Sequence, residues 1–382
     1  MKILFTGGGT GGHIFPIIAI VREIRKAYPE SDLRIFYLGP KDKFSEFLKS
    51  EGVKVRSVLA GKARRYQTFA SVFQNFFDIF FKIPLGFIES FFYLFFLAPD
   101  LVFSKGGYGS VPVIVAARSL GIPIFLHESD MVPGFSNRIL GRFSTEIFAS
   151  FAKLSLFISF PKTEYFPLEK MILVGNPVRN LYEGGDKEKA KTLLNLSFEK
   201  PVILILGGSQ GAQRINDKIL EILPQIVESF EVIHQCGEKN FKQVRGESNV
   251  MLEEDKKKYY HLYPFLNEEE MRQAYFASEI VVSRGGSTTL FEIASCGKPS
   301  IIIPLPEAAQ NHQLKNAYAY AENGSSLVIE ESNFTARFFL EKLKEIYSSQ
   351  TRMKKMQKAA KAFSRPRAAE VIASYIIHYL MT

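Results

Sequence analysis

The chain has 382 residues, of which 46% are hydrophobic and 23% charged, a balance typical of globular proteins, and its length favours two domains. The net charge of +9 suits an acidic partner, such as a nucleic acid, an anionic membrane or a phosphorylated substrate, without distinguishing among them. The two cysteines form no C-x-x-C pair, and the apolar run before the first glycines is very short. These features exclude a disulfide framework, a cysteine-based metal site and a signal peptide.

Short apolar runs that end in glycine or polar residues predict buried parallel strands in the first half of the chain. The runs are KILFTG (2–7), LRIFYLG (33–39), LVFSKGG (101–107) and IPIFLHES (122–129). Two helical patterns lie between them, at 15–28 and 110–120. This alternation of strand and helix is typical of a doubly wound α/β domain.

The glycine-rich segment GGGTGG (7–12) follows the first predicted strand and precedes a helix expected to begin near Phe15. Such a turn presents backbone N–H groups and a helix dipole to one point, which is a geometry that binds phosphate. A nucleoside-triphosphate loop would continue with Lys and Ser or Thr, where this chain has His13 and Ile14. An NAD site lacks its acidic residue on the second strand, although an NADP-type site that uses Lys41 stays open. The third interpretation is a phosphate loop with a titratable histidine at its edge.

A phenylalanine-rich segment occupies residues 69–100 and contains eleven phenylalanines at largely helical spacing. Pro84 should end or kink this helix, and three charged residues leave it short of the ~20 apolar residues of a membrane span. One helix face cannot bury eleven phenylalanines, so a peripheral patch that binds an anionic membrane through 69–96 is favoured over a core helix. The basic residues expected to attract anionic headgroups are Arg64, Arg65 and Lys82.

The second half of the chain repeats the alternation of apolar runs and helical patterns, within 201–217, 230–237, 279–295 and 299–306. The sequence therefore predicts two doubly wound α/β domains, 1–178 and 179–363, with a last helix at 364–382 that packs back on the first domain. A cleft between two such domains is the default place for a ligand.

Three loops of the second half carry polar side chains. Ser209 lies in the turn GGSQGAQRIN (207–216), and SRGGSTTLFEIA (283–294) is another glycine turn before a helix. There, Thr289 and Glu292 have the spacing of a capping box, and Glu292 could alternatively accept hydrogen bonds from ribose hydroxyls. Four successive amide or imidazole side chains at 310–313 suit sugar hydroxyls. The sequence contains no D-x-D carboxylate pair for a magnesium-bridged diphosphate.

The chain resembles the MurG family of bacterial peptidoglycan glycosyltransferases. The segments that carry the resemblance occur in the family's order from about residue 3 to about residue 320: TGGGTGGHIFP, FSKGGYGSVP, IPIFLHESDMVPG, GNPVR, LGGSQGAQRIN, SRGGSTTLFEIASCGKP and NHQLKNA. The resemblance implies a GT-B fold and inverting transfer of N-acetylglucosamine from UDP-GlcNAc to the C4 hydroxyl of the muramoyl sugar in lipid I, giving lipid II. It implies a peripheral location on the cytoplasmic face of the cell membrane, no metal or cofactor, and no nucleic-acid partner. Cell-wall synthesis and division proteins are further candidate partners.

The resemblance also assigns roles residue by residue. His13 matches the family's proposed base, and Glu128 is the second candidate for that role. The residues matched to the acceptor side are Gly9, Thr10, Gly11, Gly12, Tyr108 and Ser110. The residues matched to the donor are Thr10, Gly11, Gly12, Asp130, Arg179, Ser209, Leu266, Ser287, Thr288, Thr289, Glu292, His312 and Gln313.

One departure from the family concerns HESD (127–130), where the family usually reads H-E-Q-N. Asp130 replaces an amide that contacts the donor sugar, and a carboxylate can accept hydrogen bonds there but cannot donate them. Two other functions stay open: transfer to another membrane lipid such as diacylglycerol, and a non-catalytic nucleotide-sugar-binding module. The retained His13 and Glu128 disfavour the second of these.

Overall fold

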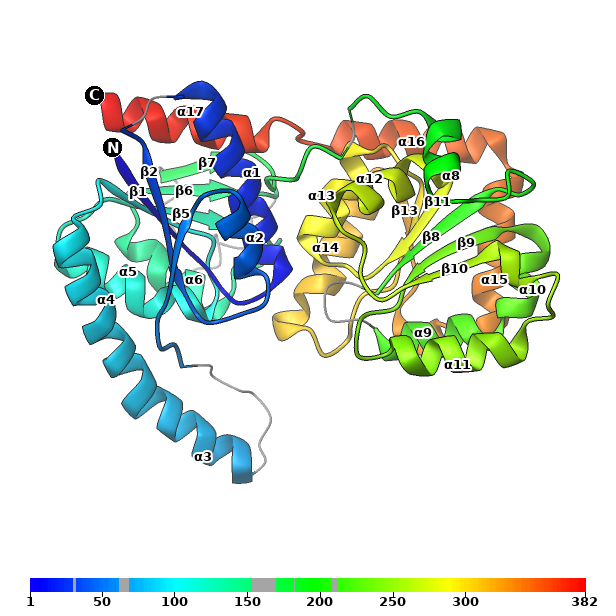
Figure 1. Cartoon of the computed structure of the whole chain (residues 1–382), viewed down its shortest axis with the longest axis horizontal. Helices are drawn as coiled ribbons and strands as arrows, with labels where there is room; N and C mark the ends of the chain where they lie inside the picture. The colour runs from blue at the N-terminus through cyan, green and yellow to red at the C-terminus, as the bar shows by residue number, and fades with distance from the viewer. Residues whose placement is uncertain (30–31, 62–68, 153–169, 182, 208–211) are drawn as a thin grey trace. The chain divides into compact units, whose positions relative to one another are not determined.

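The computed structural model describes the chain except for residues 30–31, 62–68, 153–169, 182 and 208–211, drawn as a grey trace in Figure 1. The chain divides into two compact units. The first unit comprises residues 1–179 and 365–382, and the second comprises residues 180–364. Each unit has a parallel sheet with helices on it, which confirms the two doubly wound α/β domains predicted from the sequence.

The first unit is built on a seven-stranded sheet with the order β3-β2-β1-β4-β5-β6-β7, in which every neighbouring pair is parallel. The strands are β1 (Lys2–Thr6), β2 (Arg34–Gly39), β3 (Lys54–Ser57), β4 (Leu101–Ser104), β5 (Ile124–Glu128), β6 (Glu146–Ala149) and β7 (Met171–Leu173). The helices that follow β1, β2, β4 and β5 are α1 (Gly11–Ala27), α2 (Ser45–Ser50), α5 (Val111–Ser119) and α6 (Phe135–Leu140). The central strands β4 and β5 are buried along their whole length, which explains the three apolar residues with which each begins.

Helix α1 begins at Gly11, four residues before the expected start, so this expectation was wrong. Proline is common in the first turn of a helix, but Pro16 lies further inside α1. The last glycines of the glycine-rich segment and His13 therefore belong to the first turn of α1. Thr10 is the N-cap residue and has an extended backbone.

The last helix, α17 (Ala368–Met381), packs on the first unit. Tyr375 and Tyr379 contact Phe125 of β5 with ring centroids 5.7 and 5.0 Å apart, and Tyr375 also contacts Phe148 of β6 at 5.5 Å. These edge-to-face contacts cover one face of the sheet beside β5, whose end carries Glu128.

The phenylalanine-rich segment forms a continuous run of helix: α3 (Phe69–Phe77), a π-helical segment η1 (Asp78–Lys82) and α4 (Ile83–Leu97). Pro84 does not end the helix, because it lies in the first turn of α4, directly after the π-helical segment. Figure 1 shows α3 extending away from the sheet of the first unit. The side chains of residues 69–72 lie outside the described part of the chain.

Most of the described side chains of this helix are exposed, so the alternative interpretation as a core helix does not fit. Within 73–97 the fully buried side-chain positions are Asp78, Gly86, Ser90 and Leu94, a narrow stripe at intervals of four or eight residues. A Cβ atom on Gly86 would lie 1.9 Å from the carbonyl oxygen of Leu59, so only glycine permits this close packing. Phe73 and Phe96, in contrast, are 68% and 79% exposed.

By length and composition, Phe73–Leu97 is the one helix among the described residues that could cross a membrane, with 17% of its most apolar window buried. The expectation that its charges leave it too short for a span is thus not upheld. The physical reason is that residues 79–97 contain only two charged side chains, Lys82 and Glu89.

The second unit is built on a six-stranded parallel sheet with the order β10-β9-β8-β11-β12-β13. The strands are β8 (Val202–Leu206), β9 (Glu231–Gln235), β10 (Tyr260–Tyr263), β11 (Ile280–Ser283), β12 (Ser300–Ile302) and β13 (Ser326–Val328). Helices cover both faces (Figure 1). One face packs against α9 (Gln213–Glu221), α10 (Leu223–Ser229), α11 (Phe241–Met251) and α15 (Ala336–Ser348). The other packs against α8 (Lys187–Leu193), α12 (Glu268–Ala277), α13 (Ser287–Ser295), α14 (His312–Ala321) and α16 (Gln350–Phe363).

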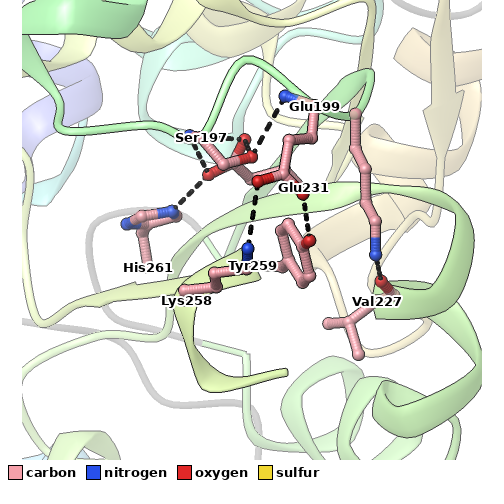
Figure 2. Close-up of polar contacts among 8 residues, drawn as sticks. Ser197, Glu199, Val227, Glu231, Lys258, Tyr259 and His261 are labelled. Carbon is pink, nitrogen blue, oxygen red and sulfur yellow. Dashed lines mark hydrogen bonds and ion pairs between the residues drawn. The ribbon is translucent and has the colours of Figure 1, made fainter. Parts of the chain in front are cut away.

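A buried carboxylate holds the loop before β8 to the amino-terminal ends of β9 and β10 (Figure 2). Glu231, the first residue of β9, is fully buried and accepts hydrogen bonds from the Ser197 backbone N–H (2.9 Å), the Ser197 hydroxyl (2.9 Å) and His261 Nε2 (2.8 Å). Beside it, Glu199 accepts from the Tyr259 hydroxyl and from Lys258. Because this cluster lies at the amino-terminal edge of the sheet, it stabilises the edge opposite to the ligand-binding loops expected of this fold.

Candidate functional site

The predicted acceptor-side residues of the first unit gather at the carboxyl-terminal edge of its sheet. Strand order reverses between β1 and β4, which makes the carboxyl-terminal ends of these two strands the topological switch point of the sheet. The loop after β1 is 7–10, the loop after β4 is 105–107, and the loop after β5 is 129–134. Loops at such a position are the usual ligand-binding elements of open α/β sheets.

His13 lies between the β1 and β4 loops. A Cβ atom on Gly8 would lie 3.1 Å from the imidazole ring, and a Cβ atom on Gly107 would lie 3.1 Å from its Nε2 atom. Gly107 also has a φ of +86°, a conformation that favours glycine. The two glycines thus make room for the imidazole, and Thr10 Oγ1 holds its Nδ1 atom at 2.8 Å. This contact uses the hydroxyl that could otherwise cap the helix, and α1 has no side-chain cap.

The surroundings of His13 favour its neutral form. Burial, with a smaller contribution from the cationic Lys105, lowers the pKa of the imidazole to about 4, and Asp130 partly opposes the shift. At pH 7 the ring is therefore uncharged and has one unprotonated nitrogen. The ordinary pKa of a histidine side chain is ~6.5.

Glu128, the last residue of β5, is buried and organises the loop that follows it. Its carboxylate accepts hydrogen bonds from the Asp130 N–H (2.9 Å), the Gly134 N–H (3.3 Å) and Asn137 Nδ2 (2.8 Å). Burial and the neighbouring Asp130 raise the pKa of Glu128 to about 7, although these hydrogen bonds and Lys105 act in the opposite direction. Gly106 is required here, since a Cβ atom would lie 2.4 Å from Asn137 Oδ1.

The other acceptor-side predictions are placed on the same edge. Tyr108 and Ser110 lie in a 3-10 turn after β4 (Tyr108–Ser110), where Tyr108 is half-buried and the Ser110 hydroxyl donates to the Gly107 carbonyl at 2.8 Å. Along the glycine loop, Gly9 is half-buried, Gly11 is buried and Gly12 is exposed. Gly12 thus offers backbone that a ligand can reach.

Besides Thr10, Gly11 and Gly12, two further residues predicted to contact the donor belong to the first unit. Arg179 is buried, and its guanidinium group lies over the ring of Phe15 at 4.2 Å. Asp130 is half-exposed in the loop after β5. The structure therefore separates these two from the donor-matched residues of the second unit, 266–313.

In the second unit, Ser287, Thr288 and Thr289 form the first turn of α13, directly after β11. The N-cap residue is Gly286, and no side chain caps the helix. The capping-box interpretation of Thr289 and Glu292 is thus wrong, because Thr289 is already the third residue of the helix. Glu292 is buried instead, with the Tyr275 hydroxyl 3.5 Å from its Oε2 atom.

The start of α14 packs against the loop that precedes α13. His312 and Gln313 are the first two residues of α14, and a Cβ atom on Gly285 would lie 2.3 Å from the Gln313 carbonyl oxygen. Gln313 Oε1 accepts from the Leu305 N–H at 3.0 Å, and His312 Nδ1 lies 2.7 Å from the Ala309 carbonyl. The structure thus brings together the two donor-side segments that the sequence singled out after β11 and β12.

Leu266 lies after β10, and its buried N–H donates to Gln235 Oε1 at 2.9 Å. Ser209 lies outside the described residues. Among the described residues, no group of three or more His, Cys, Asp or Glu side chains could hold a metal ion.

Three residues of these sites were missed by sequence reasoning. Lys105 and Asn137 contact the loop of Glu128, and Gln235 orients Leu266. Of these three residues, only Lys105 could have been identified from the sequence, because it is a charged residue directly after a predicted apolar strand.

Comparison with family models covers most of the chain. Residues 3–149 match the glycosyltransferase family 28 N-terminal domain, and residues 202–372 match the glycosyltransferase family 28 C-terminal domain.

Two similar curated proteins both carry the name UDP-N-acetylglucosamine–N-acetylmuramyl-(pentapeptide) pyrophosphoryl-undecaprenol N-acetylglucosamine transferase. The protein from Treponema denticola is 36% identical, over 98% of this chain and 96% of its own length. The protein from Shouchella clausii is 34% identical, over 91% of each chain.

Solved structures show the same fold at lower identity. The crystal structure of Acinetobacter baumannii MurG matches with a TM-score of 0.71 and 23% identity, over 99% of both chains. A putative UDP-N-acetylglucosamine 2-epimerase from Listeria monocytogenes matches with a TM-score of 0.72 and 12% identity, over 100% of this chain and 97% of its own. These matches confirm the GT-B fold. One of the two structures is named MurG and the other an epimerase, so the fold alone does not decide the reaction.

Proposed function

The chain belongs to glycosyltransferase family 28, and from this membership we infer that it transfers N-acetylglucosamine from UDP-GlcNAc to lipid I. The acceptor atom is the C4 hydroxyl of the muramoyl sugar, the transfer inverts the anomeric centre, and the product is lipid II of peptidoglycan synthesis. The observation that carries this conclusion is the whole-length match to transferases named for this reaction. Transfer to diacylglycerol is not favoured, because those relatives are named for the other acceptor.

The donor is proposed to bind the second unit. The first turn of α13 presents hydroxyls and the positive end of the helix dipole, which suit the diphosphate. Glu292 would accept from the ribose hydroxyls, and His312 and Gln313 would contact the sugar. Since the Leu266 N–H already donates to Gln235, its carbonyl oxygen is the group proposed to meet the uracil. Ser209 keeps its proposed role near the diphosphate, and Arg179 and Asp130 keep the donor contacts that the resemblance assigns to them.

The acceptor is proposed to bind the first unit, with its diphosphate on the glycine loop 9–12. The backbone of this loop precedes and begins α1, so N–H groups and the positive end of the helix dipole point to one place. Tyr108 and Ser110 would line the same edge.

His13 is proposed as the general base that takes the proton from the acceptor hydroxyl. It is half-buried and neutral at pH 7, and its Nε2 atom would be the unprotonated, basic nitrogen with Nδ1–H donating to Thr10 Oγ1. Glu128 is fully buried and already accepts three hydrogen bonds, so it is proposed to position the 129–137 loop instead. Access to substrate distinguishes the two residues.

The exposed phenylalanines of 73–96 are proposed to bind the cytoplasmic face of the membrane, where the lipid acceptor lies. Helix α4 packs on the first unit through its buried stripe, so its phenylalanine face is available to a lipid surface while the other face is covered. Lys82 is not free to bind headgroups, because it pairs with Asp78 at 2.6 Å. Arg64 and Arg65 lie outside the described residues. Cell-wall synthesis and division proteins stay candidate partners.

One assay tests the reaction. The purified protein should release UDP from UDP-GlcNAc in the presence of lipid I and produce lipid II. Release with diacylglycerol instead would support the alternative acceptor, and UDP-GlcNAc binding without release on either lipid would indicate a binding module.

A further inference from the structure

Lys105 is a buried cation to which the proposed mechanism gives no role. It follows β4 directly and is 1% exposed. Its ammonium group has three hydrogen-bond partners on segments far apart in sequence: His127 Nδ1 at 2.8 Å, Asn176 Oδ1 at 3.0 Å and the Ser129 hydroxyl. An ammonium group has three N–H donors, so these partners use all of them.

This arrangement fixes the tautomer of His127. In its charged form the ammonium group of Lys105 can only donate, so His127 Nδ1 is then the accepting, unprotonated nitrogen. The proton then lies on Nε2, which donates to the Gly175 carbonyl at 2.9 Å. Burial and Lys105 hold the pKa of His127 well below its ordinary value, so the ring stays neutral. Lys105 thus joins β4, β5 and the 175–176 segment through one histidine orientation.

The charge of Lys105 depends on two carboxylates of the same edge. Its three direct partners are neutral, and burial lowers the pKa of the ammonium group to about 7, while Glu128 and then Asp130 oppose this shift. Asp130 is the residue that stands where the resemblance expects an amide. The titratable groups around Lys105 are therefore His13, His127, Glu128 and Asp130.

We propose that Lys105 is a positioning residue of the acceptor site, whose ammonium group holds the end of β5 and the start of the 129–134 loop against β4 and the 175–176 segment and balances the charge of Asp130. The proposal rests on the proposed acceptor role of this edge of the first unit. Lys105 does not touch substrate; it acts through His127 and Ser129 on the loop that carries Glu128 and Asp130.

The first test reads the imidazole directly and needs no catalysis. In the full-length protein with ¹⁵N-labelled histidine, His127 should show an unprotonated Nδ1 and a protonated Nε2 at pH 6, where most Lys105 side chains are charged, with the signal assigned by its loss in His127→Gln. In Lys105→Met, which keeps the length but not the charge or donors, the His127 signals should move to a mixture of tautomers. Lys26→Met, which changes a lysine with a 79% exposed side chain on α1, should leave them unchanged. A protonated Nδ1 on His127 in the wild-type protein overturns the proposal, whether or not the variant folds.

The second test separates positioning from general damage. Lys105→Met should lower kcat/KM for lipid I by about tenfold or more and leave UDP affinity unchanged. If Asp130 and Lys105 balance each other, Lys105→Met combined with Asp130→Asn should lose less than the product of the single losses, by a factor of roughly 2 to 150. A folded Lys105→Met variant with wild-type kcat/KM and independent effects in the double variant would refute the role. Absence of any transfer to lipid I by the wild-type protein would overturn the proposed function alone, because the tautomer result does not depend on it.

Discussion

Replacement of His13 by alanine should remove the proposed base without removing any donor contact. General bases typically contribute about 10²–10⁴-fold to the rate. Because the pKa of His13 is lowered to about 4, its imidazole is a weaker base than one matched to neutral pH, and the expected loss lies at the lower end, about 10²-fold or roughly 2.7 kcal/mol. His13→Ala should therefore retain UDP affinity and lose about two orders of magnitude in single-turnover rate.

The assay is single-turnover transfer at saturating UDP-GlcNAc and lipid I from pH 5.5 to 8.5, with His13→Ala, His13→Gln and Glu128→Gln in parallel. His13→Gln is the matched control, since glutamine can keep a hydrogen bond to Thr10 Oγ1 but cannot act as a base at these pH values. It should lose nearly as much rate as His13→Ala. Glu128→Gln keeps one acceptor oxygen for the loop and replaces the other with an amide N–H₂ group, and it should lose about tenfold at most.

The pH dependence gives an independent check. An imidazole with a pKa of about 4 is only ~1% protonated at pH 6, so His13 itself should cause no loss of rate between pH 6 and 8. Any decline below pH 7 would come from protonation of Glu128, whose pKa is about 7, and should disappear in Glu128→Gln. A nearly wild-type rate in His13→Ala together with a loss above 10²-fold in Glu128→Gln would refute this reasoning and assign the base to Glu128.

Three further predictions address the donor, the membrane and stability. Glu292→Ala should weaken UDP binding, measured by calorimetry, by roughly 10- to 150-fold, which is the effect of losing one hydrogen bond to a charged group. Unchanged UDP affinity in a folded variant would show that Glu292 does not belong to the donor site. Replacement of Phe76, Phe80 and Phe96 by serine should release the protein from anionic liposomes while UDP still binds, because the transfer of each phenylalanine side chain to lipid contributes about 1.5–3 kcal/mol to binding. Val250→Ser, at an exposed position of the second unit, is the control. Retention of the triple variant on liposomes would contradict the membrane role. Glu231→Gln should lower the free energy of unfolding of the second unit by about 1.5–3 kcal/mol at pH 7. Burial raises the pKa of Glu231, but hydrogen bonds from His261 and Ser197 outweigh this effect and lower the pKa. The difference in unfolding free energy between the wild type and Glu231→Gln, measured by urea titration, should therefore be lost as the pH falls below 4.5. An equal difference in unfolding free energy at pH 7 and pH 3 would exclude a stabilising role for the Glu231 carboxylate.

The buried strands could be predicted because their sequences show the burial directly. Strands such as β4 and β8 are covered on both faces, so every residue is apolar or nearly so, and the alternation with helices identified the parallel sheets. Edge strands were not predicted: β3 reads KVRS, with three exposed positions, and β10 reads YHLY, with all four positions half-buried. Their partners, and not their own composition, make them strands.

From the sequence, the candidate sites could be predicted only as separate loops, each of which follows a strand. His13, Glu128 and Glu292 stand out because each is a titratable residue beside a glycine turn or a strand end. Their partners come from elsewhere in the chain: Asn137 reaches Glu128 from α6, and Gln235 reaches Leu266 from β9. Such contacts depend on sheet order and on which side chain faces which loop, and neither is encoded in local spacing.

The pKa values of His13 and Glu128 diverge although the two residues share one edge of the sheet. Burial disfavours charge of either sign, so it lowers the pKa of the imidazole and raises that of the carboxyl group. The Lys105 cation lowers both values, which deepens the shift of His13 and limits that of Glu128. At neutral pH His13 is thus uniformly in its base form, while Glu128 exchanges between a carboxylate that holds its loop and a protonated acid. A base must be unprotonated in nearly every molecule that binds substrate, and in this field His13 meets that condition over a wider range of pH than Glu128 does.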